Sequence, residues 1–229
     1  MIKEKFSQPS RPAGFFITGT DTDVGKTYAT GCIGLSLLQQ GLKVSPRKPI
    51  ASGCILQADG TLLSEDALYI QQACLSSESL QTICPNTFEP AISPQRALKQ
   101  ANRLFTTQML AKACDKPTEC FALVEGAGGF YSPISSDGLN ADLAKTLGYP
   151  VVLVIGNRLG CINSALLTIE AIKRSKLSLH SIIINDISKD ADIENVRDIQ
   201  ALVQAESIQV FHLKYNATYT AQPISGFVL

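Results

Sequence analysis

The chain has 229 residues, of which 45% are hydrophobic and 17% charged, an ordinary balance for a globular protein with a well-filled core. Its 20 Lys and Arg residues equal its 20 Asp and Glu residues, so no field of one sign attracts nucleic acid or anionic lipid. No apolar run approaches the roughly 20 residues that cross a bilayer, and the seven cysteines form neither a Cys-x-x-Cys pair nor a metal-ligand pattern. We therefore expect a cytoplasmic protein with reduced thiols that binds neither nucleic acid nor a membrane.

Short apolar segments alternate with longer amphipathic segments along most of the chain. Strands are predicted at 14–18, 42–45, 121–124, 151–155, 181–184 and 208–213, and helices at 27–40, 64–73, 106–115, 140–147, 162–175 and 191–205. Several strand segments are apolar almost throughout, as in strands that are covered on both faces. The pattern predicts a single α/β domain over residues 1–229, with a doubly wound, mostly parallel sheet and helices on both faces.

Two regions depart from this alternation. Residues 1–12 are polar and predict a loose tail. Residues 51–102 contain scattered Pro, Ser and Gly, and they predict long functional loops over the sheet edge with one helix.

The strongest motif is GTDTDVGKT at 19–27, which lies between a predicted strand and a predicted helix. In such a loop, backbone N–H groups and a helix N-terminus converge on phosphate oxygens. Lys26 would contact the β- and γ-phosphates, Thr27 would ligate Mg²⁺, and Gly25 would allow close backbone approach. Because Thr20 occupies the usual place of the first glycine, the alternative is a strand–turn–helix with a plain cap.

Three further segments place charged residues where ligands of open α/β sheets bind. Lys48 begins KPIASG (48–53) after the second strand, Asp66 lies at a helix start, and Glu125 ends a strand in VEGAGG (124–129). Mg²⁺ prefers hard oxygen ligands, which the two acids would supply. Singly, these could be a solvated lysine, a helix-start charge and a plain turn, but beside a phosphate loop they indicate one nucleotide site.

Together with LGCIN (159–163), these segments resemble the dethiobiotin synthetase family in the same order, and the resemblance covers about residues 14–186. The early glycine is the spacing of that family, a group of P-loop NTPases. The resemblance implies that 7,8-diaminononanoate, CO₂ and ATP give dethiobiotin, ADP and phosphate. A substrate carbamate would attack the γ-phosphate, and the second amine would then close the cyclic urea.

The resemblance also implies the roles of individual residues. Catalysis would use Lys26, Lys48 and Thr22; ATP would contact Asp23, Val24, Gly25, Lys26, Thr27, Tyr28 and Asn185; the substrate would contact Thr22, Lys48, Ser52, Glu125, Gly128, Gly160 and Asn163; and Mg²⁺ would be held by Thr27, Asp66 and Glu125. In the family the 160–163 turn comes from the neighbouring subunit, which implies a homodimer with a shared active site. An ordinary helix cap at Asn163 and a strand-end turn at Asn185 are the alternatives.

The sequence departs from the family at a few positions, among them Asp23, Phe130 and Ser164, where the family usually has Glu, Trp and His. Residues 211–215 also lack the Ile-Pro segment that the family places near the base.

Three other functions compete with this interpretation. A partner-regulated switch ATPase would carry a lysine where this chain has Asp21. An amidating synthetase would need an added glutaminase domain, for which 229 residues leave no room. A catalytically inactive binding module is disfavoured because the candidate phosphate and metal residues are all present.

Overall fold

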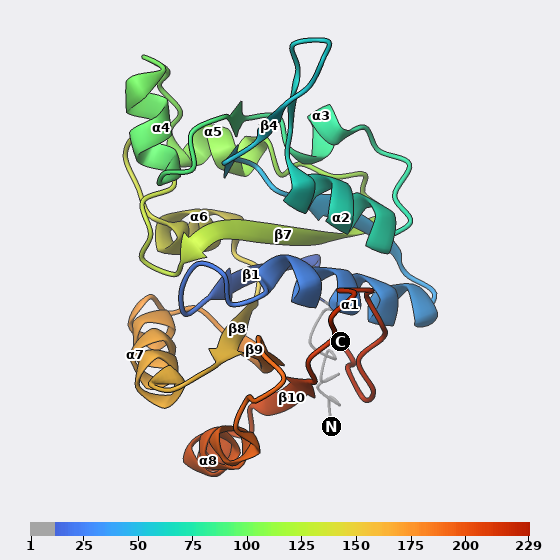
Figure 1. Cartoon of the computed structure of the whole chain (residues 1–229), viewed down its shortest axis with the longest axis vertical. Coiled ribbons are helices and arrows are strands. Elements are labelled where there is room, and N and C mark those ends of the chain that lie inside the picture. Colours follow the sequence, from blue (N-terminus) through green and yellow to red (C-terminus); the bar gives the residue numbers. More distant parts are fainter. Residues whose placement is uncertain (1–11) are drawn as a thin grey trace, which may run out of the picture.

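The computed structural model describes residues 12–229, and its centre is a sheet of six parallel strands (Figure 1). In spatial order they are β10 (Gln209–Leu213), β9 (Leu179–Asp186), β8 (Val151–Asn157), β1 (Gly14–Gly19), β7 (Cys120–Gly129) and β2 (Lys43–Arg47). All six predicted strands are confirmed, and so is the doubly wound sheet. From β1 the chain first builds one half of the sheet and then the other, so β1 lies at a switch point where open α/β sheets bind ligands.

Helices cover both faces because alternate strand residues point in opposite directions. Phe15 and Ile17 of β1 pack in the layer beneath α1 (Lys26–Gln39), together with Ile224 and Phe227 near the C-terminus. Phe16 packs in the opposite layer. That layer is formed with α4 (Pro94–Gln100), α5 (Thr107–Lys112), α6 (Asn140–Leu147), α7 (Cys161–Arg174) and α8 (Ile193–Val203), the last followed by a 3-10 turn, Gln204–Glu206.

Residues 51–102 are more ordered than the sequence predicted. The expected helix is present as α2 (Glu65–Ala73), but α3 (Leu80–Ile83), α4 and two small sheets accompany it. The small sheets pair β3 (Ala51–Ser52) with β6 (Thr87–Phe88), and β4 (Ile55–Leu56) with β5 (Leu62–Leu63). The prediction of loops with one helix was therefore wrong, because elements this short have no readable period.

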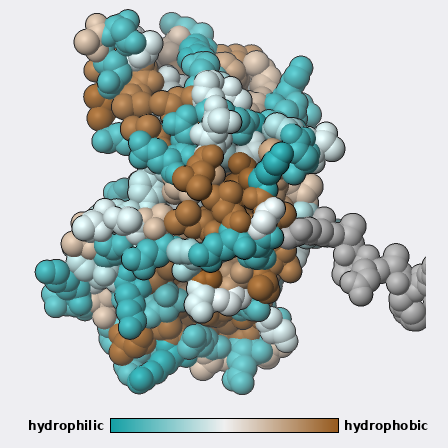
Figure 2. Space-filling model, turned by 90° about the vertical axis from the view of Figure 1, so that its right-hand side faces the viewer, coloured by the Kyte–Doolittle hydropathy of each residue, from teal (hydrophilic) through white to brown (hydrophobic). Residues whose placement is uncertain are grey.

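The face on the side where α1 ends carries both polar and apolar areas (Figure 2). Figure 2 shows that this face is hydrophilic over most of its area, with hydrophobic groups gathered near its middle. Over residues 12–229, no helix combines the length and apolarity that a membrane span requires. All but the last residue of the predicted N-terminal tail lies outside the described residues. All seven cysteines are free thiols, as expected.

Candidate active site

The phosphate loop joins β1 to α1, and a side chain of β9 holds it in place. Gly25 has φ 86°, a left-handed conformation, and a Cβ built there would lie 2.1 Å from the Nδ2 atom of Asn185. That same amide donates a hydrogen bond to the carbonyl of Val24 at 3.2 Å. Glycine is therefore required at position 25 both for its φ angle and for the contact with Asn185.

Lys26 begins α1 and extends back across the loop. Its Nζ atom donates a hydrogen bond to the carbonyl oxygen of Asp21 at 2.7 Å, and the residue is only 7% exposed. Burial, followed by the nearby charge of Lys48, lowers the pKa of Lys26 to about 8. An anion at this position would compensate a cation that the fold leaves poorly solvated.

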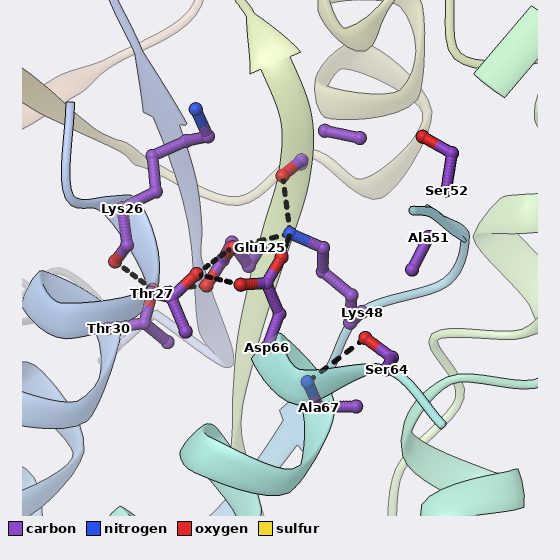
Figure 3. A network of polar contacts seen from close by, with 12 residues as sticks. Lys26, Thr27, Thr30, Lys48, Ala51, Ser52, Ser64, Asp66, Ala67 and Glu125 are labelled. Carbon is purple, nitrogen blue, oxygen red and sulfur yellow. Dashed lines mark hydrogen bonds and ion pairs between the residues drawn. The ribbon is translucent and has the colours of Figure 1, made fainter. Parts of the chain in front are cut away.

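Three oxygen-bearing side chains converge beside the loop (Figure 3). The hydroxyl of Thr27 lies 2.7 Å from Oδ1 of Asp66 and 3.0 Å from Oε1 of Glu125. Thr30, one turn later on α1, donates a hydrogen bond to Oε2 of Glu125 at 2.9 Å. One hydroxyl and two carboxylates thus form a set of hard oxygens of the kind that Mg²⁺ prefers.

Asp66 reaches this set because α1 and α2 pack closely. A Cβ at Gly31 would lie 2.7 Å from the ring of Tyr69, and a Cβ at Gly34 would lie 2.5 Å from the sulfur of Cys74. The two glycines therefore let α2 approach α1, and the first turn of α2 then brings Asp66 to Thr27.

Lys48 lies between the two carboxylates. Its Nζ atom is 2.6 Å from Oε1 of Glu125 and 2.7 Å from Oδ2 of Asp66. Burial opposes the charge on Lys48, but the two acids outweigh it and raise the pKa of the ammonium above its ordinary value. Lys48 also lowers the pKa of Asp66. In Figure 3 the ammonium of Lys26 points away from this cluster.

These groups surround a cavity of about 220 Å³. It is lined by Thr22, Asp23, Gly25, Lys26, Thr27, Lys48, Ala51, Ser52, Asp66, Glu125, Ala127 and Gly128. The pocket at the carboxyl ends of the strands is therefore polar. Four separate parts of the chain contribute to it two lysines, a hydroxyl and two acids. Among residues 12–229, no three His, Cys, Asp or Glu side chains form a metal-binding group by themselves, so a metal here would need Thr27 as well as the acids.

Comparison with known proteins identifies the family. A protein family described as an AAA domain matches residues 13–213. The chain is 40% identical over 201 residues to an ATP-dependent dethiobiotin synthetase of Cellvibrio japonicus, covering 86% of this chain and 87% of the relative. It is 36% identical over 197 residues to the synthetase of Ruthia magnifica, covering 86% of this chain and 89% of that relative. It is 42% identical over 168 residues to the synthetase of Pseudomonas paraeruginosa, covering 72% of this chain and 73% of that relative. The chain belongs to the ATP-dependent dethiobiotin synthetase family.

Solved structures support the fold of this synthetase family member and nothing finer. A MinC:MinD cell division complex of Aquifex aeolicus aligns with a TM-score of 0.52 at 15% identity, covering 89% of this chain and 82% of the other. A putative plasmid partition protein of Borrelia burgdorferi, bound to AMPPNP, aligns with a TM-score of 0.50 at 12% identity, covering 96% and 92%. At such identities the switch-ATPase interpretation gains nothing beyond the shared sheet.

The cavity of this synthetase joins most of the predicted site residues but not all. Five lie outside its lining, namely Val24, Tyr28, Gly160, Asn163 and Asn185. Val24 is a buried residue of the phosphate loop, and Asn185 contacts its carbonyl. Tyr28 instead lines a second cavity of about 740 Å³, beside β10 and the segment that follows it.

Thr30 and Asn140 contact residues that line the cavity, and the sequence did not single them out. Thr30 follows Thr27 by three positions, and helical periodicity could have placed both hydroxyls on one face. Asn140 gave no such signal, because an asparagine at a helix start resembles an ordinary cap. Its side chain is fully buried and donates to the carbonyls of Ala127 and Gly129 at the end of β7.

Proposed function

We propose that this chain closes the ring of dethiobiotin from 7,8-diaminononanoate and CO₂ with the use of ATP. The observation that carries the proposal is the single cavity in which Lys26, Lys48, Thr27, Asp66 and Glu125 meet, in a chain 36–42% identical to dethiobiotin synthetases. Such a reaction needs no covalent bond to the enzyme. Its demands are the positioning of three reactants and the neutralisation of phosphate charge.

The phosphate loop would bind the nucleotide. Backbone N–H groups before α1 and the ammonium of Lys26 would face the phosphates, with Asp23, Val24 and Thr27 in the same loop. Because burial lowers the pKa of Lys26 to about 8, a bound phosphate would stabilise its charged form further. Tyr28, which lines the second cavity, and Asn185, which contacts the loop at Val24, would lie towards the nucleoside.

The reacting end of the diamine would lie between Thr22, Lys48, Ser52 and Gly128. The hydroxyl of Ser52 already donates its proton to the carbonyl of Ile92 at 2.6 Å, so its lone pairs are what it offers to a ligand. It would therefore accept a hydrogen bond from a substrate amine. Lys48 would neutralise the carbamate, whose oxygen attacks the γ-phosphorus as ADP leaves. The second amine then attacks the carbamate carbon, phosphate leaves, and the released protons pass to water.

Mg²⁺ fits the oxygen set at one end of the cavity. Thr27, Asp66 and Glu125 would hold it, since one hydroxyl and two carboxylates already converge there. When bound, the ion would neutralise charge on the β- and γ-phosphates. The ammonium of Lys48 occupies the space between the acids in this structure, so its contacts with them would give way to contacts with the carbamate.

The 160–163 turn supports a homodimer with a shared site. Gly160 and Asn163 do not line the cavity of their own chain. The adjacent Leu159 is fully exposed, and Leu166 and Leu167 on α7 are 42% and 64% exposed. We infer that a second copy covers this apolar face and that its turn, at the N-terminus of α7, would hold the substrate carboxylate.

The deciding experiment incubates the purified protein with 7,8-diaminononanoate, bicarbonate, Mg²⁺ and ATP. Dethiobiotin is followed by mass spectrometry and phosphate by a colorimetric assay. One dethiobiotin per phosphate is the expected result. Phosphate without dethiobiotin would refute the proposed substrate, and absence of both products would refute the proposed reaction.

A further inference from the structure

The end of β7 leaves the sheet where it borders the cavity. Ile17 of β1 pairs with Glu125, but Gly19 pairs with Gly129, so Thr18 alone stands opposite residues 126–128. These three residues, called here the β7 bulge, widen the strand beyond its neighbour. Backbone groups in a bulge lose their strand partners and need others when they are buried.

Asn140 supplies partners for Ala127, at the centre of the bulge, and for Gly129, the residue that follows it. Its Nδ2 atom donates to the carbonyl of Ala127 at 2.6 Å and to that of Gly129 at 2.8 Å, while its Oδ1 atom accepts from the N–H of Ala127 at 3.2 Å. The hydroxyl of Ser132 accepts from the N–H of Gly129 at 2.9 Å. Asn140 has no exposed surface and is the first residue of α6, so one fully buried amide takes the place of a missing strand.

The bulge is shaped to receive this amide. A Cβ at Gly126 would lie 2.5 Å from Oδ1 of Asn140, which no side chain could accommodate without a shift. The backbone N–H of Asn140 donates to the carbonyl of Ser132 at 3.0 Å, which fixes the start of α6 against the same loop. The position of the bulge is therefore determined by α6, on the opposite side from the cavity.

The other side of the bulge forms a wall of the cavity. Ala127 and Gly128 line it with Thr22 and Ser52, and a Cβ at Gly128 would lie 3.8 Å from the hydroxyl of Thr22. The phosphate-binding Lys26 is held separately, by Asp21. The phosphate loop pairs with β7 only at its first residue, Gly19, which lies opposite Gly129. A displacement of residues 126–128 would therefore change the space beside the reacting diamine more than the position of Lys26.

We propose that Asn140 is a positioning residue that fixes the β7 bulge as the wall confining the diamine carbamate. This inference rests on the proposed function of the cavity. With the wall in place, the second amine meets the activated carbamate carbon and water is kept from it. With the wall displaced, water would attack that carbon, releasing phosphate and returning the carbamate without ring closure.

The test uses Asn140→Asp in the full-length protein, because a carboxylate keeps the size but cannot donate to two carbonyls. The KM for the diamine should rise about ten- to a hundredfold. The KM for ATP should stay within about twofold, and phosphate released per dethiobiotin should exceed one.

The matched control is Asn195→Asp on α8, where a half-buried amide donates to Asn157 away from the cavity. It should leave both KM values and the phosphate ratio unchanged.

A change in kcat alone, with both KM values and one-to-one coupling retained, would overturn the proposal. If Asn140→Asp does not fold, Ser132→Ala decides, because it removes a contact of Gly129, the residue at which the bulge ends. It should shift the diamine KM and the phosphate ratio in the same direction by a smaller factor, and no shift would overturn the proposal. Failure of the proposed function is a separate outcome, since the unaltered protein would then form no dethiobiotin.

Discussion

The ammonium of Lys48 lies 2.6 Å from Oε1 of Glu125, whose side chain has no exposed surface. Glu125 comes from the end of β7 and Lys48 from the segment after β2, so the pair joins two strand ends. A buried charge without its partner is costly, because the low-dielectric surroundings cannot solvate it. The pair therefore contributes to the fold as well as to the proposed chemistry.

Replacing Lys48 with Met should destabilise the protein by about 3–5 kcal/mol, because Glu125 would remain buried without its cation. The double variant Lys48→Met/Glu125→Gln should recover most of that loss. Urea unfolding in the presence of EDTA measures both effects. Equal stability of the single and double variants would contradict the idea that the unpaired acid is the cause.

Replacing Lys26 with Ala should abolish turnover and leave a folded protein. Because burial lowers the pKa of Lys26 to about 8, the fold disfavours its charge, and removing it should leave the melting temperature equal or higher. Calorimetry and the dethiobiotin assay test the two statements together. Retention of wild-type activity would remove Lys26 from the proposed phosphate site.

Replacing Glu125 with Gln should raise the Mg²⁺ concentration that gives half-maximal rate by about tenfold or more, since an amide is a weaker ligand than a carboxylate. The matched control is Glu65→Gln, an exposed acid one residue before Asp66 on α2. Titration of the rate with Mg²⁺ gives the comparison. The same Mg²⁺ requirement in both variants would mean that Glu125 is not a ligand.

Mixing two inactive variants tests the shared site. Lys26→Ala removes the phosphate contact, and Asn163→Asp would repel the substrate carboxylate from the neighbouring subunit. After random exchange, half of the dimers would be mixed and one site in each would be intact, so about a quarter of wild-type activity should return. Co-expression and rate measurement check this. If no activity returns although mixed dimers form, each active site lies within one chain.

The buried cysteines should make stability depend on alkaline pH. Burial raises the pKa of Cys74, Cys84 and Cys114 to about 12. The unfolded chain releases these protons above about pH 9 while the folded chain keeps them, so stability should fall as pH rises from 9 towards 12. Urea midpoints at pH 8 and pH 10 measure the fall, which should be smaller in Cys114→Ala.

At pH 8, iodoacetamide should label the partly exposed Cys120 first.

The sequence was informative where one rule decides the outcome. Fully covered parallel strands must be apolar throughout, which made β8 and β9 readable. A phosphate loop between a strand and a helix left few alternatives for Lys26 and Thr27. The convergence of Lys48, Asp66 and Glu125 followed from their places at strand and helix ends.

Other features depended on tertiary contacts that no local pattern records. Helices α3 and α4 are too short for a periodic signal in the sequence. They form because their residues pack over the edge of the sheet. The β7 bulge arises from a register shift against β1, which glycines permit but do not predict. Asn140 could not be distinguished from an ordinary cap until its amide was seen beneath that bulge.

The close packing of α1 on α2 has a consequence for protein engineering. Glycine-to-alanine substitution within a helix is a common route to thermostability, because alanine favours the helix by roughly 0.5–1 kcal/mol. At Gly31 and Gly34 the added methyl groups would press against Tyr69 and Cys74. Overpacking of this kind costs about 1–3 kcal/mol, more than the helix gains. The variants would therefore be less stable, and α2 would move outward with Asp66 and weaken the proposed Mg²⁺ site. Both positions should therefore be kept as glycine when stabilised variants are designed.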